Sequence, residues 1–169
     1  MKGFAKTDVG KAREMNQDYY SIPSSVSDLQ FYILAFVIGV YNGWEIASRI
    51  AAETTKNYIQ NNFKKIEHDK EAILKLVKDA MEYANMVVYE ASKKDENLQG
   101  MGTTLDVCFI YNSKIYIGHV GDSRIYLIKK DIARKITKDH SYVQQLVEDK
   151  KITREEAEHH PKKNKLLKA

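Results

Sequence analysis

The hydrophobic pattern changes period along the chain, from short apolar runs to helical stripes and back. Gln30–Val40 is almost wholly apolar without alternation, which favours a strand buried on both faces. Gly121-Asp122-Ser123 separates two further apolar runs and predicts a hairpin with a carboxylate at its tip. The other predicted strands are Gly3–Val9, Asp18–Ile22, Leu105–Tyr111, Ile115–Val120, Ile125–Ile128 and Ile132–Thr137.

Two long segments have helical periodicity. The first follows Asn42, a candidate N-cap with Glu45 as its reciprocal partner. The second runs from about Asp69 to Ser92. The first helix is predicted to bury a stripe with a four-residue repeat, namely Ile46, Ile50, Thr54 and Tyr58. The second is predicted to bury Ile73, Leu76, Val77, Ala80, Met81, Ala84, Val87 and Val88.

The order of these elements indicates an α+β fold. Strands come first, then two helices, then more strands, and finally two short helices. The short helices are predicted at Tyr142–Asp149 and after the capping box Thr153-Arg-Glu-Glu156. Antiparallel sheets with helices layered outside fit this order. A length of 169 residues suits a single domain over 1–169.

Composition and charge narrow the choice of partners. The net charge of +4 is mild, and the C-terminal lysines alternate with glutamates and lack aromatic neighbours, which favours a solvated helical face over a nucleic-acid site. No run of 18 apolar residues occurs, so no membrane span is expected. The N-terminus lacks the apolar stretch of a signal peptide, and Cys108 is the single cysteine. Together these features predict a cytoplasmic protein.

Six short motifs lie in order over nearly the whole chain. They are Ala12-Arg-Glu-Met-Asn-Gln-Asp18, Tyr41-Asn-Gly-Trp-Glu-Ile-Ala-Ser48, Met101-Gly-Thr-Thr104, Gly118-His-Val-Gly-Asp-Ser-Arg124, Thr137-Lys-Asp-His-Ser141, and Ile152-Thr-Arg-Glu-Glu-Ala157 with His160-Pro161. With these motifs the chain resembles the metal-dependent protein phosphatase family (PPM, type 2C) in its bacterial form. Any one motif alone would be a weak signal, but their shared order is specific.

The resemblance implies a β-sandwich of two antiparallel sheets flanked by helix pairs, with Mn²⁺ or Mg²⁺ ions at one end. It implies hydrolysis of phosphoserine and phosphothreonine esters in proteins by a metal-activated water. By position, Asp18 matches a metal-ligating aspartate, and Asp122 matches the aspartate at a peripheral third metal. Arg13 matches the arginine that holds the substrate phosphate, and residues 138–164 resemble the flap beside the active site.

The chain departs from the family pattern after its long apolar run. The family normally reads Ala-Asp-Gly-Met-Gly-Gly where this chain reads Ala35-Phe-Val-Ile-Gly-Val40. Phe36 therefore replaces the aspartate that bridges two metals, and Val37 replaces a glycine whose carbonyl approaches one of them. Trp44 replaces another family glycine. The chain also ends at Ala169, before the family's last strands and two further metal-ligating aspartates, so the C-terminal strands are expected to be missing.

Each of the three assigned site residues also suits an ordinary structural role that needs no metal or phosphate. Asp18 also suits a turn or cap, Asp122 an Asx-type turn and Arg13 a surface ion pair. His119 and His140 are expected to be structural, and no catalytic residue is assigned.

Three hypotheses about function follow. The chain is a serine/threonine phosphatase whose site is completed by another segment or chain, a non-catalytic pseudophosphatase-like binding module, or a protein that self-associates through uncovered sheet edges. The binding module would keep Arg13 for phosphopeptides or use the apolar surface Phe36–Trp44. Since one core carboxylate cannot hold a dinuclear centre, we expect weak Mn²⁺ or Mg²⁺ occupancy and weak or absent hydrolysis by the chain itself.

Overall fold

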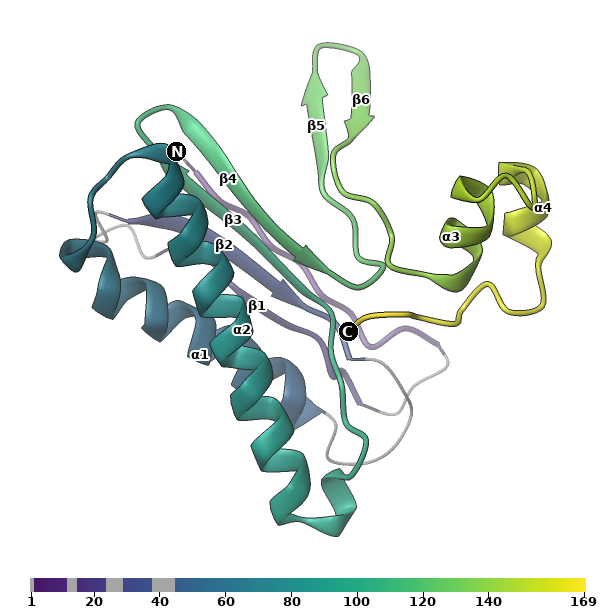
Figure 1. Cartoon of the computed structure of the whole chain (residues 1–169), viewed down its shortest axis with the longest axis horizontal. Coiled ribbons are helices and arrows are strands. Elements are labelled where there is room, and N and C mark those ends of the chain that lie inside the picture. Colours follow the sequence, from purple (N-terminus) through teal and green to yellow (C-terminus); the bar gives the residue numbers. More distant parts are fainter. Residues whose placement is uncertain (1, 12–14, 24–28, 38–44) are drawn as a thin grey trace. The chain divides into compact units, whose positions relative to one another are not determined.

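A computed structural model of the chain describes residues 2–11, 15–23, 29–37 and 45–169 (Figure 1). It consists of two compact units, Met1–Gly118 and His119–Ala169. The antiparallel α+β fold expected from the sequence is confirmed within these units. That residues 1–169 form a single domain stays a prediction.

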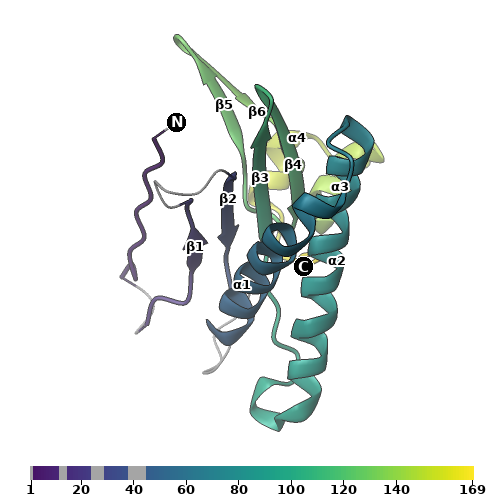
Figure 2. The ribbon, with the colours of Figure 1, turned by 90° about the vertical axis from the view of Figure 1, so that its left-hand side faces the viewer.

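The first unit combines a four-stranded sheet with two helices that lie side by side (Figures 1 and 2). The sheet has the order β1-β2-β3-β4, and β2 runs antiparallel to both β1 and β3. The elements are β1 (Tyr19–Ser21), β2 (Gln30–Ala35), α1 (Glu45–Asn62), α2 (Lys70–Lys94), β3 (Leu105–Tyr111) and β4 (Lys114–Val120). Single 3₁₀ turns follow α1 and α2, at Phe63–Lys65 and Glu96–Leu98.

The second unit contains a two-stranded sheet and two short helices. Its elements are β5 (Tyr126–Lys129), β6 (Ile132–Lys135), α3 (Tyr142–Glu148) and α4 (Arg154–His159). Strands β5 and β6 pair antiparallel around a turn in which Lys130 has φ 54°. The predicted capping box is confirmed, because the Thr153 hydroxyl accepts from the Glu156 N–H and the Glu156 carboxylate accepts from the Thr153 N–H.

Burial alternates along β2, so the prediction that this strand is buried on both faces is wrong. Phe31, Ile33 and Ala35 are at most 2% exposed, whereas Leu34 and Phe36 are each 40% exposed. Helices α1 and α2 cover one face of the sheet, which explains why only alternate residues of β2 enter the core. Apolar residues at the other positions hide this two-residue period in the sequence.

Helix α1 buries mainly small residues, whereas α2 also buries larger aliphatic ones. In α1 the predicted stripe is wrong, because Ile46, Ile50, Thr54 and Tyr58 are only half-buried. The residues buried instead are Ala47, Ser48, Ala51, Ala52, Thr55 and Ile59. Small side chains let the α1 backbone approach the sheet closely, which shifts the buried face by one position. In α2 the predicted face is largely confirmed, with Met81 and Val87 half-buried.

Two expected strand arrangements are wrong. Strand β4 lies beside β3 and not beside β5, so Gly121-Asp122-Ser123 joins two sheets and does not close a hairpin. The hairpin is instead formed by β3 and β4, around Asn112 and Ser113 with φ 47° and 59°. Residues 3–9 do not form a strand. Among the described helices, none has both the length and the apolar composition needed to cross a membrane.

Candidate functional site

Asp122 stands on a corner between β4 and β5 in the second unit. The corner turns at Gly121, which is buried and has φ 110°, a conformation that favours glycine. The Gly121 carbonyl accepts from the His140 N–H at 2.7 Å, and the Gly121 N–H donates to His140 Nδ1 at 3.3 Å. Asp122 itself is exposed. The corner therefore presents a carboxylate to solvent from a backbone that His140 holds in place.

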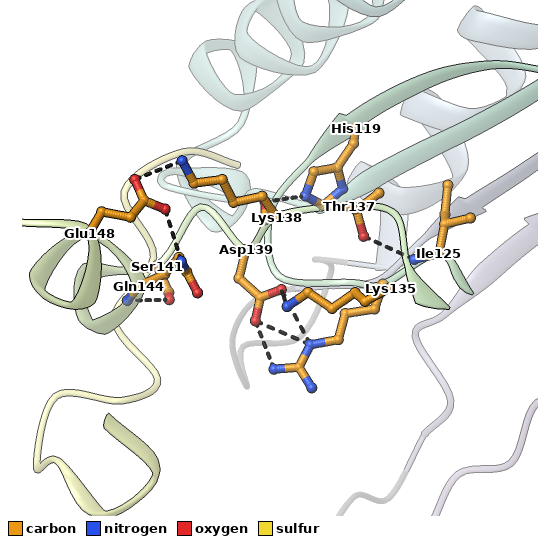
Figure 3. A network of polar contacts seen from close by, with 10 residues as sticks. His119, Ile125, Lys135, Thr137, Lys138, Asp139, Ser141, Gln144 and Glu148 are labelled. Atoms are coloured by element: carbon orange, nitrogen blue, oxygen red, sulfur yellow. Dashed lines mark hydrogen bonds and ion pairs between the residues drawn. The ribbon is translucent and has the colours of Figure 1, made fainter. Parts of the chain in front are cut away.

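Asp139 is the centre of a polar network in the same unit (Figure 3). The Arg124 guanidinium donates to both Asp139 carboxylate oxygens, with its shortest contact at 2.7 Å, and Lys135 Nζ donates at 2.8 Å. Desolvation alone would raise the pKa of Asp139, but the hydrogen bonds from Arg124 and Lys135 outweigh it and lower that pKa below its usual value. The hydrogen bonds that Arg124 donates to Asp139 raise the pKa of Arg124. These contacts join the segment before β5 to Lys135 of β6 and to Asp139 in the segment that follows β6.

Sequence reasoning assigned no role to Arg124, Lys135 or Asp139. Arg124 and Asp139 did lie in two of the six motifs, which was the signal that could have found them. Around them is a pocket of about 860 Å³, lined by side chains of both charges that include Asp122, Lys138, Arg154 and Lys163. Such a lining suits a polar, charged ligand.

Asp18 stands directly before β1 in the first unit and is half-buried. Its N–H donates to Asn16 Oδ1 at 3.1 Å, and the carbonyl of the preceding Gln17 accepts from Ser48 Oγ of α1 at 2.8 Å. The backbone that carries Asp18 is thus attached to α1. Gln17 is 7% exposed, and Arg13 lies outside the described residues.

Phe36 directly follows β2, at the position where the resemblance implies a bridging aspartate. Its N–H donates to Thr104 Oγ1 at 3.2 Å, and its carbonyl accepts from the Thr104 N–H at 2.9 Å and from Thr103 Oγ1 at 3.0 Å. Val37 pairs with Thr103 in an isolated bridge and is fully buried. Position 36 is therefore held firmly, with an apolar ring in place of a carboxylate. The remainder of the predicted apolar surface, residues 38–44, lies outside the described residues.

The described residues do not fit a dinuclear metal centre. Within ranges 2–11, 15–23, 29–37 and 45–169, no three His, Cys, Asp or Glu side chains come together as a metal site. Mn²⁺ and Mg²⁺ prefer several oxygen ligands, and a phenyl ring offers none. The rings of His119 and His140 lie 4.9 Å apart, and His119 Nε2 contacts the Lys138 carbonyl at 2.9 Å.

Comparison with protein families and curated sequences places these features in context. Residues 24–162 match the family described as protein phosphatase 2C. The chain is 30% identical over 164 residues to the serine/threonine phosphatase stp of Listeria innocua, a match that covers 97% of this chain and 64% of that protein. It is 33% identical over 159 residues to protein phosphatase PhpP of Streptococcus pneumoniae, covering 94% of this chain and 63% of PhpP. The chain thus spans a little under two thirds of the length of these relatives.

Comparison with solved structures likewise finds serine/threonine phosphatases. The fold is similar to serine/threonine phosphatase Stp1 from Staphylococcus aureus, with a TM-score of 0.86 and 28% identity over 96% of this chain and 63% of that one. It is also similar to PstP from Mycobacterium tuberculosis, with a TM-score of 0.75 and 27% identity over 96% of this chain and 64% of that one. A structure of the PstP catalytic domain holds two manganese ions.

Proposed function

Because this chain belongs to the protein phosphatase 2C family, we propose that it is a serine/threonine phosphatase-like domain in which hydrolysis is weak or absent. We propose that it acts as a pseudophosphatase-like module that binds phosphoserine and phosphothreonine proteins. The relatives' names support the substrate class, and the residue at position 36 supports the loss of catalysis.

Position 36 is the observation that carries this proposal. Phe36 is fixed by three hydrogen bonds at the end of β2, and the neighbouring Val37 is fully buried. Local rearrangement would have to break these contacts and still would not supply a carboxylate at this position. Metal-assisted hydrolysis depends on such ligands to hold the ion that activates water. We therefore derive no hydrolytic step through a metal at this position.

Phosphate binding is proposed to rest on Arg13. A guanidinium can donate two parallel hydrogen bonds to phosphate oxygens, and this interaction needs no metal. A chain that keeps Arg13 but lacks a carboxylate at position 36 is therefore expected to bind phosphorylated peptides without turning them over. Phosphorylated and unphosphorylated copies of one peptide, titrated against the chain and against Arg13→Ala, would test this step.

Hydrolysis of p-nitrophenyl phosphate and of a phosphothreonine peptide, with and without millimolar Mn²⁺, tests the catalytic part. The variants are Phe36→Asp and Phe36→Asp/Val37→Gly. The matched control is Leu34→Asp, which adds a carboxylate on the same strand face at the same 40% exposure. We expect no Mn²⁺-dependent turnover by the unaltered chain or by Leu34→Asp, and measurable turnover once position 36 is an aspartate.

Two results would contradict the proposal. Mn²⁺-dependent turnover by the unaltered chain would show that the domain is an active phosphatase. Absence of turnover in every variant, with circular dichroism showing that each is folded, would show that Phe36 is not what limits catalysis.

A second candidate function is an active phosphatase whose site is completed by another polypeptide. The retained Asp18 favours it, because the backbone around this residue is held by Asn16 and, through Gln17, by Ser48. Asp122 is also retained, at the corner between β4 and β5. In this proposal, Asp18 is a ligand of Mn²⁺ or Mg²⁺ in the core site and Asp122 a ligand of a separate, peripheral ion, and the partner supplies the further carboxylates. Mixing the chain with the remaining segment of the Listeria innocua relative should then restore turnover, and Asp18→Asn should abolish it.

Self-association and a cytoplasmic setting complete the proposal. The exposed side chains of Leu34 and Phe36, on the open face of the sheet, support self-association, which sedimentation velocity would detect as a concentration-dependent dimer.

Burial raises the pKa of the Cys108 thiol, which makes it a poor nucleophile and suits a reducing compartment. We propose no nucleic-acid or membrane partner, because the basic residues near the C-terminus alternate with acidic ones.

A further inference from the structure

A strap of residues 160–167 returns to the start of α3 in the second unit. Two main-chain hydrogen bonds attach it there: the Tyr142 N–H donates to the Lys165 carbonyl, and the Leu167 N–H donates to the His140 carbonyl, both at 2.8 Å. Lys165 and Leu167 are exposed. A segment attached by so few bonds at the surface can open without unfolding of the unit that carries it.

His140 connects this strap to the corner at Gly121. Its N–H donates to the Gly121 carbonyl at 2.7 Å, and its side-chain Nδ1 accepts from the Gly121 N–H at 3.3 Å. Nδ1 can accept a hydrogen bond only while it carries no proton, so this arrangement requires a neutral imidazole. A single residue thus ties the corner and the strap together in a form that a proton would disrupt.

A second histidine lies against the His140 ring. The ring centroids of His119 and His140 are 4.9 Å apart and the ring planes are tilted by 38°. His119 Nε2 is 2.9 Å from the Lys138 carbonyl, which can only accept, so Nε2 is the nitrogen that carries hydrogen (Figure 3). Protonation of both rings would place two positive charges side by side, which costs free energy.

The charged groups around His140 come from three directions. His119 belongs to β4, Lys138 and Asp139 directly precede His140, and Lys168 directly follows the strap. Burial lowers the pKa of His140, and the fields of His119, Lys168 and Lys138 lower it further, while Asp139 opposes them. Release of the strap would expose the imidazole to water and carry Lys168 away. A proton therefore binds the open form more tightly than the closed form.

The strap also forms part of the wall of the charged pocket of about 860 Å³. Lys163 and Asn164 line this pocket together with residues of α3 and α4. Lys163 Nζ donates to the Glu158 carbonyl at the end of α4, at 3.2 Å. Because these two lining residues directly precede the attached part of the strap, release of the strap frees one wall of the pocket to move.

We propose that His140 is a proton-sensitive latch that holds the strap closed along the pocket when neutral and releases it when protonated. A proton on Nδ1 would face the Gly121 N–H, donor against donor, so the ring must turn away and the main-chain bonds made by His140 weaken. Closure is complete above pH 6.5, and it weakens as the pH falls from there to the lowered pKa of His140. The latch is independent of phosphate binding through Arg13.

Hydrogen exchange of the whole chain, followed by NMR between about pH 5 and 7.5, tests this proposal. The measured quantity is the protection factor of the Leu167 amide, in which the intrinsic pH dependence of exchange is divided out. We expect it to fall below pH 6.5 by up to about tenfold per pH unit, the limit for one linked proton. Amides of β2 and β3 serve as an internal reference and should keep their protection.

Three variants identify the group that titrates. In His140→Asn an oxygen can still accept from the Gly121 N–H but does not titrate, so protection of Leu167 should no longer depend on pH. The matched control His159→Asn changes an exposed histidine of α4 and should behave like the unaltered chain. Lys168→Gln removes one of the cations that act on His140, so the midpoint of the transition should move to higher pH.

Several outcomes would overturn the proposal. Protection of Leu167 that does not change with pH would do so directly, and an unchanged pH dependence in His140→Asn would assign the transition to another group. Parallel loss of protection in β2 and β3 would show unfolding of the chain as a whole. A midpoint that Lys168→Gln leaves in place would separate the strap from the proton.

Discussion

At the scale of single residues, Asp139 shows how one carboxylate can hold several segments together. It is 9% exposed and accepts hydrogen bonds from Arg124, 15 residues earlier, and from Lys135. Removing one member of such a group leaves the others with unmatched charge. The network is therefore expected to matter more for stability than the exposed ion pairs of the helices.

We predict that Asp139→Asn lowers the free energy of unfolding by ~1–2 kcal/mol. This loss is smaller than for a fully buried ion pair, because the Arg124 side chain is 51% exposed and water screens its charge. Glu148→Gln is the control, since its 2.7 Å ion pair with Lys138 joins side chains that are 64% and 37% exposed and should contribute little to stability. Urea unfolding of both variants measures the difference. Equal stability of Asp139→Asn and the unaltered chain would refute the role of the network.

His140 is expected to make stability depend on pH. Burial lowers the pKa of His140 below its ordinary 6.5, and the positive fields of His119, Lys138 and Lys168 add to this effect while Asp139 opposes it. The unfolded chain therefore binds a proton more readily than the folded chain. As pH falls from above 6.5 toward the lowered folded pKa, the free energy of unfolding should decrease.

His140→Asn tests this expectation, because an asparagine oxygen can still accept from the Gly121 N–H but does not titrate. Chemical unfolding between about pH 5 and 8 should show a shallower pH dependence for the variant. A control, His159→Asn, changes an exposed histidine of α4 and should leave the slope as it was. Identical slopes for all three proteins would rule out His140 as the titrating group.

At the scale of secondary-structure elements, Gly118 governs how closely β4 and α2 approach each other. A Cβ atom at this position would collide with Met81 Sδ and would lie 2.9 Å from Val77 Cγ1. Val77 is buried and Met81 half-buried on α2, so a larger residue would have to displace these side chains or push the helix away from the strand. This contact gives a physical reason for a glycine at the start of one of the six motifs.

We predict that Gly118→Ala destabilises the first unit by ~1–3 kcal/mol. Gly102→Ala is a matched control, because nothing lies within 4 Å of the added Cβ and the backbone conformation there is ordinary. That control should be neutral or slightly stabilising, since alanine restricts the unfolded chain. Thermal unfolding distinguishes the two, and a neutral Gly118→Ala would mean that Met81 and Val77 simply move aside.

At the scale of the whole molecule, the two units differ in how well their strands are covered. The central residues of β2 and β3, such as Ile33 and Val107, are buried against the helices. In contrast, all eight residues of β5 and β6 are exposed. A two-stranded sheet with so little burial is marginally stable on its own.

Amide hydrogen exchange should reflect this contrast. We expect amides of β2 and β3 to exchange far more slowly than those of β5 and β6, because core strands open only with the global unfolding of their unit. Mass spectrometry of peptides covering 30–35, 105–111 and 126–135 would measure it. Equal protection of all three would show that β5 and β6 are covered in solution, for example by a second copy of the chain.

The sequence by itself determined those features that depend on neighbouring residues. The strand Leu105–Tyr111 agrees with the structure because its residue types favour β structure, and the capping box at Thr153 agrees because it arises from contacts within a few residues. The order of six motifs likewise sufficed to recognise the family, and position 36 could be compared with that pattern directly. Arg13, Asp18 and Asp122 as site residues stay predictions.

Tertiary structure alone decided what depends on distant parts of the chain. The pairing of β4 with β3, the one-sided burial of β2 and the inward face of α1 follow from which surfaces the elements bury against one another. The Arg124–Asp139 contact and the Tyr58–Tyr83 ring pair join residues 15 and 25 positions apart, through contacts that no local pattern encodes. The physical reason is that hydrogen bonds in turns and caps are local, whereas burial is a property of the assembled surface.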